Sequence, residues 1–112
     1  MDISFAARRL ERDLTDPRRM QRRYGELTRR LKARLSVLAQ ARSLSDVPHV
    51  PPERCHPLSN DYEGCFAVDL SGNWRLTFEP DHDPVPTKDD GGVDLAVITA
   101  IKIVAIVDYH GR

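Results

Sequence analysis

The sequence contains few of the features that characterise membrane proteins or secreted proteins. None of its 112 residues belongs to an apolar run that approaches the roughly 18 residues of a membrane-spanning helix. The first residues, MDISFAARRLERD, lack the long apolar segment of a secretory signal peptide. We therefore expect a cytoplasmic protein without a membrane partner, folded as a single domain over residues 1–112.

Cysteine is also scarce, because Cys55 and Cys65 are the only two in the chain. A cytoplasmic protein keeps such thiols reduced, and their spacing is not that of a CxxC metal site. A disulfide between them, across two neighbouring strands, is the less favoured alternative. Asp81, His82 and Asp83 are adjacent loop residues, which is a weak pattern for metal ligands. We expect neither a metal nor another cofactor.

Charge is balanced overall but unevenly distributed along the chain. Residues 1–42 contain 12 Arg or Lys and 5 Asp or Glu, a net charge of +7, and residues 43–112 carry the compensating −7. Such asymmetry indicates a polyanion or an acidic protein as the partner of the first half. The plainer alternative, that arginine-rich helices are simply solvated, is equally compatible with the charge pattern.

The first half of the chain predicts a short strand followed by two helices. Residues 2–5 alternate as in a strand, and residues 6–14 form an amphipathic helix. The stretch 15–41 begins with Asp16 as N-cap and Pro17 at the first helical position. Gly25 allows close packing or marks a bend. The apolar positions of this stretch recur every three or four residues, at Met20, Tyr24, Leu27, Leu31, Leu35 and Leu38.

The second half predicts strands. Four prolines favour extended chain in the linker 43–61, where residues 55–58 suit an edge strand. Residues 64–80 read as a hairpin with its turn at 71–73, and the acidic loop 81–92 follows. The apolar run 97–107 is expected to be a central strand. The fold class is therefore α+β, with two N-terminal helices packed on one face of a small, mainly antiparallel sheet.

Several polar residues interrupt the strand pattern and could meet at one end of this sheet: His56, Asn73, Arg75, Asp108, Tyr109 and His110. Two imidazoles, a carboxylate, a phenol and a guanidinium suit acid–base chemistry on a phosphodiester. Each residue also has a structural interpretation. His56 could be a turn residue beside Pro57, and Arg75 could pair with an acid across the hairpin. The last three residues of the set could be a solvated terminus.

Five segments resemble one known family: RYGELTRRLKARLSVLAQARSLSDVP, RCHPL, GCFAVDLSGNWRLTFEP, KDDGGVD and IVAIVDYH. They are similar to HigB-type toxins of bacterial toxin–antitoxin systems, in the RelE/ParE superfamily. The resemblance implies the RelE-like microbial RNase fold and a ribosome-dependent mRNA endoribonuclease that inhibits translation. It also implies a HigA-like helix-turn-helix antitoxin as partner, beside the ribosome and mRNA, with operator DNA bound only through the antitoxin complex.

The resemblance also implies roles for individual residues. His56 matches a family histidine, Arg75 and Asn73 match the family's NWR, and the final DYH corresponds to Asp108, Tyr109 and His110. Arg75 would then stabilise charge, Asp108 or His110 would act as base, and His56 or His110 as acid. Tyr109 would orient the nucleotide. The RNA would also contact Asn73 and four arginines on one flank of the helical stripe: Arg19, Arg23, Arg30 and Arg34.

One departure from the family pattern keeps alternatives open. Where such toxins often carry LKGD, this chain has Ser59 and Asn60 in place of the lysine and glycine. The loss of a basic group favours a catalytically weakened protein that binds nucleic acid or an antitoxin. A ParE-like gyrase inhibitor is the other alternative, although such proteins generally lack this set of residues.

Overall fold

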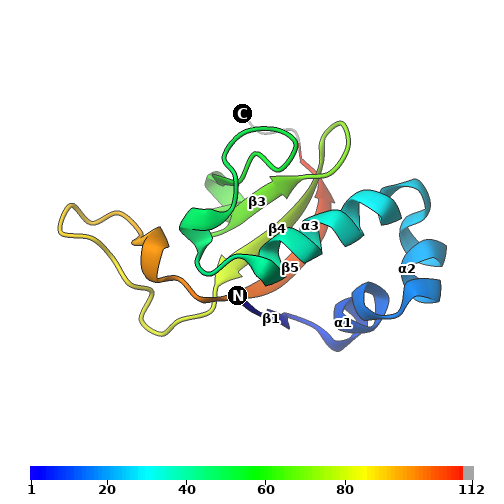
Figure 1. Ribbon diagram of the computed structural model, residues 1–112, viewed down its shortest axis with the longest axis horizontal. Coiled ribbons are helices and arrows are strands. Elements are labelled where there is room, and N and C mark those ends of the chain that lie inside the picture. The colour runs from blue at the N-terminus through cyan, green and yellow to red at the C-terminus, as the bar shows by residue number, and fades with distance from the viewer. Residues whose placement is uncertain (110–112) are drawn as a thin grey trace.

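The computed structural model describes residues 1–109, in which a five-stranded sheet is crossed on one face by a long helix (Figure 1). The strand order is β1-β5-β4-β3-β2. β1 is parallel to β5, and the other neighbours are antiparallel. The prediction of an α+β fold with a mainly antiparallel sheet is confirmed. The strands are β1 Asp2–Phe5, β2 His56–Pro57, β3 Phe66–Asp69, β4 Trp74–Pro80 and β5 Ala100–Asp108.

The helical half contains one more helix than predicted. The second predicted helix is broken at Gly25, where the backbone adopts φ +50°, a conformation that favours glycine. A single turn of 3-10 helix, Gly25–Leu27, separates the two parts. The predicted helix start is confirmed, because the Asp16 carboxylate accepts hydrogen bonds from the backbone N–H of Arg18 and Arg19. The helices are α1 Arg8–Thr15, α2 Pro17–Tyr24 and α3 Thr28–Gln40.

α3 lies across the sheet, whereas α1 and α2 pack against each other beyond one end of it (Figure 1). Leu31 and Leu38 of α3 are fully buried against the side chains that β3, β4 and β5 direct to this face. The core therefore forms mainly between one helix and one sheet face, whereas two helices were predicted to cover this face; Leu14 of α1 and Met20 of α2 join the core beyond the end of the sheet. The principal buried strand residues are Phe66, Val68, Leu76, Phe78, Ile101 and Ile103.

The hairpin and the edge strand lie where the sequence predicted them. β3 and β4 pair as Val68 with Leu76 and Asp69 with Arg75, around the turn at residues 71–73. β5 begins three residues later than expected, because Leu95–Val97 form a 3-10 turn. It is flanked by β1 and β4 and is thus an interior strand. Short 3-10 turns also occur at Leu44–Asp46 and Asn60–Tyr62.

The pairing register assigns residues to the two faces of the sheet. Because cross-strand partners share a face and successive residues alternate, His56 lies on the same face as Asp69 and Arg75. This face is the one opposite α3, and we call it the second face. Within residues 1–109, each helix falls short of the length and apolar character that a membrane span requires.

Candidate functional site

Three charged side chains form a cluster at the end of the second face where β3 ends and β4 begins. The Asp69 carboxylate pairs with Nε of Arg75 at 2.9 Å. It also accepts two hydrogen bonds from Arg54, from Nε at 2.7 Å and from Nη2 at 3.0 Å. Two guanidinium groups thus share one carboxylate, and the cluster keeps one uncompensated positive charge. We call these residues, Arg54, Asp69 and Arg75, the Asp69 cluster.

The two arginines of the Asp69 cluster differ in accessibility. Arg75 is 11% exposed, and its Nη1 donates to the carbonyl oxygens of Gly72 at 2.7 Å and Trp74 at 3.0 Å. Arg54 is 41% exposed. The structural interpretation of Arg75, an ion pair across the hairpin, is therefore correct. Arg75 is held in place at the end of the hairpin, and Arg54 presents the more accessible guanidinium.

His56 is the first residue of β2 and pairs with Ala67 of β3, so it is a strand residue rather than a turn residue. Its Nδ1 lies 2.6 Å from the carbonyl oxygen of Arg54. A carbonyl oxygen only accepts hydrogen bonds, so Nδ1 must carry the proton. The neutral ring is then the tautomer whose Nε2 has a free lone pair, as a proton-transfer group requires. The ring is half-buried, which restricts its orientation further.

The end of β5 is attached to the hairpin turn. The Tyr109 backbone N–H donates to the carbonyl oxygen of Asn73 at 2.8 Å. The Tyr109 ring meets the ring of Tyr62 edge-on, with centroids 5.6 Å apart and planes at 88°. Tyr109 is therefore held by contacts at both backbone and ring, unlike a solvated terminus.

The structure brings some of the predicted catalytic residues together and separates others. His56 and Arg75 share the second face and are connected through the Asp69 cluster. Tyr109 and Asn73 lie at the same end of the sheet. The register pairs Asp108 with Trp74, which places Asp108 at this end of β5 but on the face of α3. His110 lies outside the described residues.

The predicted arginine flank is wrong in part, because the helix is not continuous. Arg19 and Arg23 belong to α2, whereas Arg30 and Arg34 belong to α3. Arg34 is buried at 7% exposure, and its Nε donates to the carbonyl oxygen of Asp69 at 2.7 Å. Arg34 thus supports the end of β3 and is not a surface charge. Arg19 pairs with Asp13 at 3.1 Å, and Arg23 and Arg30 remain exposed.

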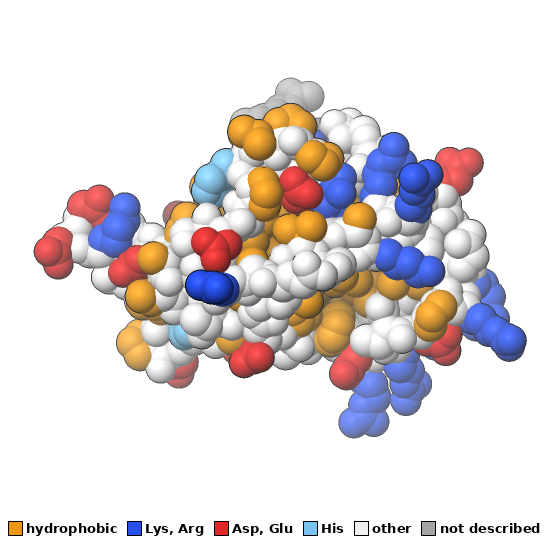
Figure 2. Space-filling model, in the orientation of Figure 1, with side chains coloured by type: hydrophobic (Ala, Val, Ile, Leu, Met, Phe, Trp, Pro, Cys, Tyr) orange, Lys and Arg blue, Asp and Glu red, His pale blue; other side chains and the backbone are white. Residues whose placement is uncertain are grey.

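The uneven charge of the sequence reappears on the surface of the protein. Figure 2 shows Arg and Lys side chains gathered over α1, α2 and the beginning of α3. Acidic side chains occur at the tip of the protruding loop between β4 and β5, the predicted acidic loop. On the face that Figure 2 shows, the basic half of the chain therefore presents a basic region.

The two cysteines are free thiols, and their surroundings do not suit nucleophilic or metal chemistry. Burial raises the pKa of Cys55 to about 11. Burial, with a smaller effect of the Glu79 carboxylate, also raises the pKa of Cys65. Both side chains are consequently protonated at neutral pH, whereas nucleophiles and metal ligands are thiolates. Within residues 1–109, no three His, Cys, Asp or Glu side chains group as metal ligands.

Sequence reasoning missed Arg54, Asp69 and Tyr62 as members of the site. Asp69 could have been found, because a hairpin with its turn at 71–73 places residue 69 opposite Arg75. The sequence around Arg54 contains no comparable pattern that would place it opposite Asp69. Arg54 has a positive φ of 44° in the linker, and its contact with Asp69 spans 15 residues. Tyr62 likewise reaches Tyr109 only through the tertiary fold.

We expect Asp69→Asn to lower the free energy of unfolding by about 1–3 kcal/mol, because Arg75 then keeps a largely buried charge without a carboxylate. Urea denaturation followed by circular dichroism measures this loss. The matched control is Asp90→Asn. Its exposed ion pair with Lys88, at 3.7 Å, should contribute less than about 1 kcal/mol. Equal losses in both variants would contradict a structural role of the Asp69 cluster.

A scan of the chain against models of known protein families finds no match, and a search of curated proteins finds none either.

Proposed function

We propose that this protein is a metal-independent endoribonuclease that cleaves mRNA on the ribosome, as the toxin of a toxin–antitoxin pair with a RelE-like fold. One observation carries the proposal. His56 is held by the Arg54 carbonyl oxygen in the tautomer that leaves Nε2 for proton transfer, beside a cluster with an excess positive charge. A proton-transfer group next to fixed positive charge is what cleavage of a phosphodiester by its own ribose requires.

The proposed reaction is an attack of the ribose 2′-oxygen on the adjacent phosphorus. The 2′-hydroxyl loses its proton, the new P–O bond forms, and the bond to the 5′-oxygen breaks as that oxygen takes up a proton. The products are a 2′,3′-cyclic phosphate and a 5′-hydroxyl. His56 Nε2 accepts the proton of the 2′-hydroxyl, and the 5′-oxygen takes up its proton from water. Arg54 then binds the phosphate oxygens through the N–H groups that it does not donate to Asp69, and the same carboxylate holds Arg75.

The aromatic pair at the end of the sheet supports RNA as the substrate. Tyr62 and Tyr109 hold each other edge-on near the hairpin turn. Both residues are half-buried, and the accessible part of an aromatic ring can stack on an unstacked base of single-stranded RNA. The basic surface over α1 and α2 would supply contacts to rRNA phosphates, which give affinity without sequence preference (Figure 2). A helix-turn-helix antitoxin, with operator DNA bound through it, completes the set of proposed partners.

A second candidate is a protein of the same kind that binds RNA without cleaving it. The engagement of Arg75 favours this candidate. Its Nε pairs with Asp69 and its Nη1 with two carbonyl oxygens, which leaves few donors for a phosphate. Ser59, where the resembling family has a lysine, points the same way. The two candidates differ only in whether the bound RNA is cut.

Primer extension on mRNA in a translation reaction, with the purified protein added, separates the candidates. We expect new 5′ ends that appear only on translated mRNA, with 2′,3′-cyclic phosphates at the 3′ ends of the upstream fragments. Cosedimentation with ribosomes without new ends would identify the non-cleaving candidate. Inhibition of gyrase supercoiling with neither ribosome binding nor cleavage would overturn both and indicate the ParE-like alternative.

A further inference from the structure

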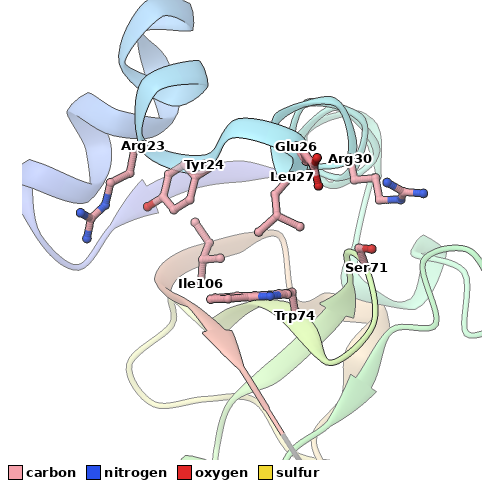
Figure 3. Close-up of a pocket in the computed structure, with 8 residues that line it drawn as sticks. All are labelled: Arg23, Tyr24, Glu26, Leu27, Arg30, Ser71, Trp74 and Ile106. Carbon is pink, nitrogen blue, oxygen red and sulfur yellow. The ribbon is translucent and has the colours of Figure 1, made fainter.

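A pocket of about 650 Å³ lies on the face of the sheet opposite the Asp69 cluster, between the α2–α3 junction and the beginning of β4 (Figure 3). Its volume is within the range of about 300–1,000 Å³ typical of small-ligand sites. The lining residues come from three parts of the chain that only the fold brings together. They are Arg23, Tyr24, Glu26, Leu27, Arg30, Ser71, Trp74 and Ile106.

One wall of the pocket is an exposed aromatic surface. Trp74 is the only tryptophan in the chain and is 40% exposed. In Figure 3 its ring extends along the pocket, with Leu27 projecting toward it from the helical side and Ile106 beside it. Large aromatic side chains that remain exposed within a pocket commonly provide a stacking surface for a ligand. A flat apolar ligand would fit this wall.

The rest of the pocket is charged. Arg23 and Arg30 are exposed and lie toward opposite ends of the pocket, and Glu26 projects near Arg30 (Figure 3). A guanidinium group can bind phosphate oxygens through paired hydrogen bonds. A carboxylate can accept a hydrogen bond from the exocyclic amino group of a base. Burial raises the pKa of the Tyr24 phenol, so its hydroxyl adds no negative charge beside a phosphate.

The break at Gly25 creates this arrangement. It ends α2 after Arg23 and Tyr24 and redirects the chain, so that Leu27 of the 3-10 turn and Arg30 of α3 approach the same space. A continuous helix would carry these side chains on one straight stripe. The hairpin turn then supplies Trp74 as the first residue of β4. The pocket is therefore built from two local features, the helix break and the tight turn.

We propose that this pocket binds a nucleotide of single-stranded RNA, with the base stacked on Trp74 and the flanking phosphates on Arg23 and Arg30. An aromatic wall between two guanidinium groups matches the alternation of base and phosphate along a strand. The inference rests on the proposed function in naming RNA as the ligand, but it requires no cleavage. It gives the exposed arginines of the basic surface a defined ligand and places a second RNA contact away from the Asp69 cluster.

The single tryptophan makes the pocket directly observable. A short 2′-O-methyl oligoribonucleotide, which cannot be cleaved, should quench Trp74 fluorescence in a saturable titration at low salt. The double variant Arg23→Ala/Arg30→Ala should weaken this binding about tenfold or more. The matched control Arg18→Ala/Arg29→Ala removes the same charge from the same two helices, outside the pocket, and should bind within a few-fold of the original protein.

A second variant tests the stacking wall. Trp74→Leu keeps an apolar side chain but removes the aromatic face, and affinity measured by anisotropy of a labelled oligonucleotide should fall about fivefold to a hundredfold. Equal losses in the two double-arginine variants, or RNA binding without a change in Trp74 fluorescence, would overturn the inference. Quenching without mRNA cleavage would leave it standing and reject the nuclease. Cleavage of mRNA without quenching of Trp74 fluorescence would support the nuclease and reject the pocket as an RNA-binding site.

Discussion

Replacement of His56 by alanine is expected to lower the rate of mRNA cleavage by about a hundredfold to ten-thousandfold, the range typical of lost acid–base catalysis. The reason is geometric. The hydrogen bond from Nδ1 to the carbonyl oxygen of Arg54, a member of the Asp69 cluster, fixes both the tautomer and the ring position and leaves Nε2 for proton transfer. Alanine removes the proton-transfer group but leaves β2 paired with β3.

The rate should be measured from the appearance of new mRNA 5′ ends, with ribosome binding measured in parallel. His82→Ala is the control. His82 accepts a hydrogen bond from the Thr99 N–H near the far end of β4, well away from the Asp69 cluster. That variant should cleave at the original rate. A His56→Ala protein that is folded, binds ribosomes and cleaves mRNA at full rate would show that the His56–Arg54 bond is structural only.

Phe78→Ala is expected to lower the free energy of unfolding by about 3–5 kcal/mol. Phe78 is fully buried in β4 under α3, and its ring stacks on that of Phe66 with centroids 6.3 Å apart. Truncation removes this ring contact and leaves a cavity between the helix and the sheet. Domains of this size are stable by only about 5–15 kcal/mol, so the variant should be close to unfolding at 37 °C.

Urea denaturation monitored by circular dichroism measures the change. Val50→Ala provides the contrast, because Val50 is an exposed loop residue and its truncation should alter the free energy of unfolding by no more than about 0.5 kcal/mol. A loss below about 1 kcal/mol for Phe78→Ala would mean that the core closes around the smaller side chain. The position of α3 over the sheet would then need another source of stability.

The local features of the fold could be read from the sequence because neighbouring residues encode them. Asp16 and Pro17 begin α2, and the turn at 71–73 joins β3 to β4, as local side-chain chemistry dictates. Apolar alternation identified the core face of the hairpin. The sequence also limited the interpretation of Gly25 to a bend or a close packing position, and its positive φ makes it a bend.

The candidate site could be predicted only in part. His56 and Arg75 interrupt apolar alternation, so the pattern itself marks them, and the register places both on the second face. Asp108 was predicted at the same end of the sheet, and it does lie there, but the sequence did not indicate its face. Its pairing with Trp74 assigns it to the other face.

The sequence by itself therefore determined the order of the elements, the core face of the sheet and the uneven charge. Only the tertiary structure decided which distant groups meet. Arg54 and Arg75 share Asp69, Arg34 is buried at the end of β3, and Trp74 faces the α2–α3 junction. The physical reason is that periodicity records which way a side chain points, whereas its partner depends on strand register and on helix breaks. Because the helix is broken at Gly25, the arginines that follow it point in other directions than they would in a continuous helix.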